Sequence, residues 1–195
     1  MIEQYNEIFL QRDVQLKTRG RSYSITSDYK QIGTMEETTE SSKNIVNQFL
    51  KLASLFSIVS LEMEVLDRKA NVLGTIIKEK GFYNDFSIFS ESGEPLATIK
   101  PTIKVKSSKM SVMDVNGNPL LHAVGGYGAT DFSIFDSNSN QQIAIIKRRS
   151  LVYTSIKDNL LNDDGYYINS NHHDKTTTLC LIAMGLILDT YYFNN

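Results

Sequence analysis

Apolar and polar residues alternate with a period of two over much of this chain. Residues 61 to 65 place three apolar side chains on one face and two glutamates on the other. Residues 103 to 106 repeat the alternation, with Lys104 and Lys106 on the polar face. Because successive side chains of a strand point to opposite faces, this pattern predicts strands that are buried on one side only.

A unit of strand, polar turn and returning strand recurs along the chain. Its clearest copies cover residues 63 to 73, 86 to 96, 110 to 120 and 132 to 140. Each copy breaks at a turn rich in Asp, Asn, Ser and Gly, of which Asn116-Gly117 is the strongest turn signal. Residues 21 to 37 predict a first hairpin, and residues 151 to 156 with 165 to 168 predict a last one. The pattern therefore predicts about six hairpins, or about twelve strands.

The chain ends in an apolar segment, residues 178 to 193, that has no polar face. A helix that is apolar all round must be buried in protein or in a bilayer. Its uninterrupted core, residues 179 to 188, is shorter than the roughly 20 residues that a membrane span needs. We therefore predict a mainly β protein with residues 1 to 195 as a single domain. Its strands form a closed antiparallel barrel around a buried C-terminal helix at residues 175 to 191.

One segment, residues 42 to 60, departs from the β pattern. Its apolar residues recur at helical spacing: Ile45, Phe49, Leu52 and Phe56. This spacing predicts one extra helix near residues 42 to 59, with Ser41 or Ser42 as its N-cap. Two interpretations are open: the helix packs on the end of the barrel, or its apolar stripe contacts a membrane or a partner protein.

The repeated hairpins lead to a terminal helix that runs into Leu186-Ile-Leu-Asp-Thr-Tyr-Tyr-Phe193. In this order of elements the chain is similar to the phospholipid scramblase and LURP-one-related group, whose fold is that of the tubby C-terminal domain. The likeness covers about residues 7 to 193. It implies a twelve-stranded barrel around a buried C-terminal helix.

The resemblance also implies two kinds of function. Tubby domains are associated with phosphoinositide binding through basic side chains. Scramblases are associated with calcium-dependent lipid movement through an acidic segment just before the helix. In that segment, Asp158, Asp163 and Asp164 lack the alternating ligands, central Gly and final Glu of an EF-hand loop. This departure argues against calcium control.

The composition narrows the classes of function. The 195 residues carry 20 Lys and Arg against 22 Asp and Glu, and a formal charge of -2 argues against a general nucleic-acid binder. The N-terminus lacks the basic start and apolar run of a signal peptide. We therefore expect a cytoplasmic protein, peripheral where it meets a membrane, with no transmembrane span. The one cysteine, Cys180, lies within the apolar helix and is expected to be a buried thiol.

The candidate site for an anionic head group consists of basic residues: Lys100, Lys104, Lys106, Lys109, Lys147, Arg148 and Arg149. On a strand, Lys104 and Lys106 share one face and can converge on a phosphate. Each basic residue near an anionic membrane contributes about 1 kcal/mol. The alternative is a set of solvated lysines that protect a strand edge.

Other polar residues have structural explanations. Asp174 precedes Lys175 and is expected to cap the terminal helix. His172 and His173 are adjacent, so on an extended chain their side chains point in opposite directions and only one of them could join a site with Asp163 or Asp164. His122 is expected in the core or at a barrel end. The sequence shows no catalytic motif and implies no metal and no cofactor.

These observations favour a non-enzymatic binding module that engages anionic phospholipid head groups or a protein partner at a membrane surface. One alternative is a lipid-handling protein of scramblase type. A second alternative is a small-ligand carrier, for which a helix in the lumen leaves little room. The sequence carries no signal of the oligomeric state.

Overall fold

The computed structural model describes residues 2–13, 20–52, 57–102, 108–126, 131–149, 165–172 and 174–192. Within these residues, twelve antiparallel strands close into a barrel whose order follows the sequence. The strands are β1 (Glu7–Arg12), β2 (Ser22–Ser27), β3 (Lys30–Glu37), β4 (Leu61–Asp67), β5 (Val72–Lys78), β6 (Phe86–Ser90), β7 (Pro95–Thr102), β8 (Lys109–Asp114), β9 (Pro119–Gly125), β10 (Asp131–Asp136), β11 (Gln142–Arg149) and β12 (Gly165–Ser170). The ring closes where β12 pairs with both β11 and β1. Two predicted strand segments, residues 103 to 106 and 151 to 156, lie outside the described residues.

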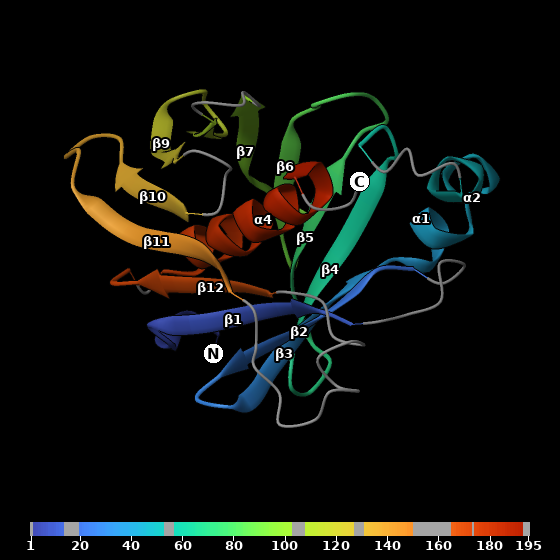
Figure 1. Cartoon of the computed structure of the whole chain (residues 1–195), viewed down its shortest axis with the longest axis horizontal. Helices are drawn as coiled ribbons and strands as arrows, with labels where there is room; N and C mark the ends of the chain where they lie inside the picture. Colours follow the sequence, from blue (N-terminus) through green and yellow to red (C-terminus); the bar gives the residue numbers. More distant parts are fainter. Residues whose placement is uncertain are drawn as a thin grey trace.

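The barrel encloses the C-terminal helix α4 (Lys175–Tyr192), which runs through the ring of strands (Figure 1). Every residue of α4 from Thr178 to Tyr191 is buried, so the predicted closed barrel around a buried helix is confirmed. The Asp174 Oδ1 atom accepts a hydrogen bond from the Thr177 backbone N–H at 2.8 Å, which confirms the predicted cap. No helix in the described part of the chain is long and apolar enough to cross a membrane.

The inner faces of the strands follow the predicted alternation, with one correction. Leu61, Met63 and Val65 of β4 are buried, while the intervening glutamates face outward. On β9, however, the buried residues are 121, 123 and 125. His122 therefore lies on the outer face, where its ring stacks on Phe135 at a centroid distance of 5.1 Å. The expectation of a core or barrel-end histidine is wrong.

The repeated hairpins share one turn design. The Asp114 carboxylate accepts hydrogen bonds from the backbone N–H groups of Asn116 and Asn118 and from the Asn118 side chain. These bonds, led by that of the Asn118 side chain, lower the pKa of Asp114 below its ordinary value. Asp67 and Ser90 make the equivalent bonds in their own turns. The polar residue at each break thus fixes the turn, as the repeated pattern suggested.

The predicted extra helix is two short helices outside the barrel, α1 (Thr39–Lys43) and α2 (Ile45–Leu52) (Figure 1). The N-cap of α1 is Thr38, and neither Ser41 nor Ser42 has this role. The helix breaks at Asn44, whose Oδ1 atom accepts hydrogen bonds from the backbone N–H groups of Val46 and Asn47 at the start of α2. A side chain that caps a new helix stops the previous one from continuing. A short 3-10 helix, η1 (Ile2–Gln4), precedes β1.

The two ends of the barrel differ. Because the strands are antiparallel, the tight turns after β2, β4, β6, β8 and β10 all lie at the end where α4 begins. There, Lys175 of α4 forms an ion pair with Glu91 in the turn after β6. The strand ends that the other connections join lie at the opposite end, where α4 finishes, and the described residues of these connections include α1 and α2. We call these the turn end and the connection end.

Candidate functional site

The predicted basic residues whose side chains the structure describes, Lys100, Lys109, Lys147 and Arg148, lie at the connection end but do not form one cluster. Lys100 near the end of β7 and Lys109 at the start of β8 are both exposed. Lys109 pairs with Thr102, two residues beyond Lys100, so the two lysines are diagonal neighbours on the outer face. Lys104 and Lys106 belong to the connection between these strands and lie outside the described residues.

The remaining basic candidates lie on β11, three strands away. Lys147 is half-buried and pairs with Asp131 on one side and Tyr167 on the other. Three inter-strand spacings separate β8 from β11, or about 14 Å. Arg148 points to the inner face opposite Tyr166, and the backbone of Arg149 pairs with Gly165. Nothing is described of the Arg149 side chain. The structure therefore brings Lys100 and Lys109 together and keeps Lys147 apart from them.

The Lys100 ammonium has a partial counter-charge. Its Nζ atom lies 3.6 Å from the Asp85 carboxylate, and both side chains are about half exposed. An exposed ion pair of this kind contributes little to stability and exchanges readily with other ions. Lys100 therefore stays available to an anionic ligand.

Helix α2 presents its apolar residues to solvent. Ile45 is 82% exposed and Phe49 is 71% exposed, and Val46 beside them is half exposed. The side chain of Leu52 is not described, and Phe56 lies outside the described residues. The opposite face of α2 carries Asn47, which is buried.

Asn47 fixes the orientation of α2. Its Nδ2 atom donates hydrogen bonds to the backbone oxygens of Ser41 at 3.2 Å and Ser60 at 3.1 Å. Its Oδ1 atom accepts a hydrogen bond from the Ser60 hydroxyl at 3.1 Å. A buried amide with these bonds holds its helix in one rotation. The apolar face of α2 consequently points away from the barrel.

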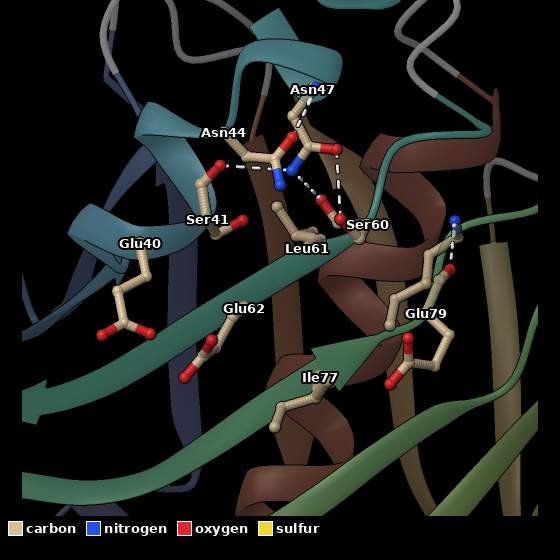
Figure 2. A pocket seen from close by; sticks show the side chains of 10 residues that line it. Glu40, Ser41, Asn44, Asn47, Ser60, Leu61, Glu62, Ile77 and Glu79 are labelled. Carbon is tan, nitrogen blue, oxygen red and sulfur yellow. Dashed lines mark hydrogen bonds between the residues drawn. The ribbon is translucent and has the colours of Figure 1, made fainter.

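A hollow of about 230 Å³ lies beneath the corner between α1 and α2 (Figure 2). Its floor is the outer face of β4 and β5, where Glu62 pairs with Ile77. Glu40 of α1 and Glu79 after β5 also line the hollow (Figure 2). The lining is therefore mainly acidic and polar.

Lys78, which sequence reasoning missed, also lines the hollow and is only 1% exposed. Its Nζ atom donates hydrogen bonds to the backbone oxygens of Val59 at 2.9 Å, Glu79 at 3.2 Å and Gly81 at 2.9 Å. These three bonds use every proton of the ammonium group. Burial, followed by the positive charge of Arg21, lowers the pKa of Lys78 to about 8.

A second group missed from the sequence surrounds the end of α4. The Asp189 carboxylate accepts hydrogen bonds from the Tyr23 hydroxyl at 2.6 Å and the Tyr166 hydroxyl at 3.4 Å, and lies 3.7 Å from Arg12. Beside it, Arg21 donates a hydrogen bond to the Thr190 hydroxyl at 3.0 Å. Burial first, and then the Asp189 charge, raises the pKa of Tyr23 far above its ordinary value. The signal in the sequence that could have revealed this group is Asp189 itself: a carboxylate that follows an apolar run is buried and needs polar partners.

The start of α4 offers no reactive group in the described residues. Cys180 is 1% exposed, and burial raises the pKa of its thiol to about 12, so the predicted buried thiol is confirmed. His172 and Asp174 are exposed beside a hollow of about 220 Å³ at this end. The described residues contain no group of three or more acidic, His or Cys side chains arranged to hold a metal ion.

Comparisons with known proteins agree with this architecture. A model of the LURP-one-related family matches residues 16–189. The X-ray structure of the Arabidopsis thaliana protein AT5G01750 superposes with a TM-score of 0.58 and covers 96% of each chain. At 11% sequence identity this likeness shows the fold alone. No curated protein matches the chain.

Proposed function

The chain belongs to the LURP-one-related family, and we propose that it is a non-catalytic module that binds anionic phospholipid head groups at a membrane surface. The observation that carries the proposal is the placement of Lys100 and Lys109 on one outer face. The connection between them adds Lys104 and Lys106 in the sequence. We call these four lysines the basic corner.

The chemistry of the basic corner suits a phosphate group. Ammonium groups on flexible side chains act as point charges that adapt to a head group without a rigid pocket. Each contributes about 1 kcal/mol near an anionic surface, and the attraction falls off within a Debye length of about 8 Å. Several lysines together therefore support reversible and salt-sensitive binding.

The barrel interior argues against a carrier of small ligands. Its axis is occupied by α4, whose residues from Thr178 to Tyr191 are buried. Enclosed sites for small molecules need clefts of about 300 to 1,000 Å³. The proposed binding surface is therefore on the outside of the barrel.

Vesicle flotation tests the proposal. We expect the protein to float with vesicles of phosphatidylcholine and phosphatidylserine and to stay behind with pure phosphatidylcholine. Lys100→Glu with Lys109→Glu removes two favourable charges, so binding should weaken by at least about thirtyfold. The matched control is Lys30→Glu with Lys69→Glu, which changes the net charge equally at exposed positions of the turn end.

Two results would contradict the proposal. The wild-type chain could fail to float with anionic vesicles at low salt, which would exclude anionic phospholipid as its ligand. Alternatively, both double variants could lose binding equally, which would show a dependence on net charge and not on the basic corner.

A further inference from the structure

Among the described residues of the connection end, the two large apolar side chains most exposed to solvent belong to α2. Ile45 and Phe49 are among the most exposed large apolar side chains, although Asn47 holds the helix in a single orientation. An exposed apolar patch with polar surroundings is typical of an interaction site. The fixed orientation means that no simple rotation of α2 buries these side chains.

A second pair of exposed apolar side chains lies in a connection that is hydrogen-bonded to the segment after α2. Phe82 is 60% exposed and Tyr83 is 51% exposed, in the connection between β5 and β6. Lys78 binds the backbone oxygens of Val59 and Gly81, which joins this connection to the segment that follows α2. The Gly81 backbone N–H also donates to the Ile58 oxygen at 2.9 Å.

The C-terminal helix braces this connection from inside. The Tyr191 ring lies 5.2 Å from the Tyr83 ring and 5.9 Å from the Phe86 ring, as centroid distances. The Tyr191 hydroxyl donates to the Asn84 backbone oxygen at 3.4 Å. Both apolar sets are therefore held in place before any partner arrives, which lowers the entropy cost of binding.

The charges near this apolar surface identify the kind of partner. Glu40, Glu62 and Glu79 line the hollow at the foot of α2. On the neighbouring strand pair, Glu36 stands directly opposite Glu64. Like charges in direct cross-strand pairs destabilise a sheet, so a cationic partner would relieve a cost that the free protein carries. The ammonium of Lys78 donates its three hydrogen bonds to backbone oxygens, so none of these bonds goes to the carboxylates.

We infer that α2 and the hollow beneath it dock a protein segment that carries both apolar and basic side chains. Its apolar residues cover Ile45 and Phe49, and its Lys or Arg side chains reach the carboxylates of Glu40 and Glu62. An anionic bilayer is disfavoured on this face because the same carboxylates repel it. The inference is independent of the basic corner, whose described members, Lys100 and Lys109, lie on β7 and β8.

Selection from a random peptide library displayed on phage tests this inference with the full-length chain. Binders are expected to be enriched in Lys and Arg together with aromatic or aliphatic residues. Synthetic copies of these binders should lose at least about tenfold in affinity for the variant Ile45→Ser with Phe49→Ser. Affinity for Glu40→Gln with Glu62→Gln should also fall and should become less sensitive to salt. All four positions are on the surface, so circular dichroism should show unchanged folding.

The control variant is Tyr29→Ser, which removes a fully exposed aromatic residue at the turn end and should leave affinity unchanged. The inference is overturned if the library yields no binder, or if the binders have no excess of basic residues. It is also overturned if the α2 variant keeps full affinity. A fluorophore at position 49 that shifts to the blue with neutral or anionic vesicles would assign this face to lipid instead.

Discussion

Ala70 occupies a backbone conformation that suits glycine. Its φ is +60°, in the turn after β4. At the equivalent turn positions Gly93 and Gly117 have φ values of +80° and +81°. An L-residue in this region costs roughly 1 to 2 kcal/mol, while glycine loses more entropy on folding. Of these three equivalent turns, the turn after β4 therefore has the least favourable residue at this position.

Ala70→Gly is expected to stabilise the protein. The gain should be about 0.5 kcal/mol, because relief of the strained φ exceeds the added chain entropy of glycine. Urea unfolding followed by circular dichroism measures it. Gly117→Ala is the opposite test and should destabilise by about 0.5 to 1 kcal/mol. A loss of stability in Ala70→Gly would mean that the methyl group makes a contact worth more than the strain.

Helix α4 stabilises the fold, because the inner faces of the strands surround this helix. Ile182 and Leu186 are fully buried within it. Ile182→Asp or Leu186→Asp would place an unpaired carboxylate in an apolar interior, which costs several kcal/mol. We expect either variant to unfold or to be insoluble, as judged by circular dichroism and gel filtration. A soluble and folded double variant would show that the helix does not support the barrel.

The elements that sequence predicted well are those with local signals. Hairpin turns and the period of two are properties of a few neighbouring residues, so the barrel and α4 followed from them. His122 was misplaced because the inner face of β9 carries small residues, Ala123 and Gly125. A Cβ atom on Gly125 would lie 2.5 Å from the Phe132 ring, so the interior excludes a larger side chain there. Close packing against distant elements decides such positions.

The α1 and α2 break and the candidate sites were harder to predict. The stripe from Ile45 onward suits one helix, and the break arises from the cap at Asn44, a single polar residue. Lys78 gave no local signal, since its three partners come from two separate connections. The acidic lining of the hollow likewise depends on Glu40 and Glu62 meeting across the fold. Contacts between distant segments have no pattern in a single sequence.

At the scale of the whole molecule, stability and recognition are divided between the two ends. The turn end consists of short turns with side-chain hydrogen bonds, as at Asp114. The connection end holds Lys100, Lys109, α2 and the hollow. It also holds buried ionisable groups that are rare elsewhere in the described interior: Arg21, Lys78 and Asp189. Stability should consequently respond to pH mainly through this end.

Two sets of groups act in opposite directions as the pH rises. Lys78 has a folded pKa of about 8, lowered from 10.5, so between these values the unfolded chain binds more protons and stability increases with pH. Burial raises the pKa of Cys180 from 9.0 to about 12 and raises those of Tyr23, Tyr166 and Tyr191 from 10.0. Above their unfolded values the folded chain holds more protons, and stability falls.

The free energy of unfolding should therefore rise from about pH 8, level off between about 9 and 10, and fall steeply above 10, where three tyrosines act together. Each proton of difference contributes about 1.4 kcal/mol per pH unit. Urea unfolding at a series of pH values measures this profile.

Lys78→Met should be less stable at neutral pH, because it leaves three backbone oxygens without their donor, and its free energy of unfolding should not rise above pH 8. Tyr23→Phe should keep the rise and reduce the slope above about pH 10.5 by about a quarter, since it removes one of the four groups, three phenols and the Cys180 thiol, that hold extra protons in the folded chain there. A rise that persists in Lys78→Met would assign the alkaline stabilisation to another group, and an unchanged slope in Tyr23→Phe would mean that this phenol ionises in the folded barrel.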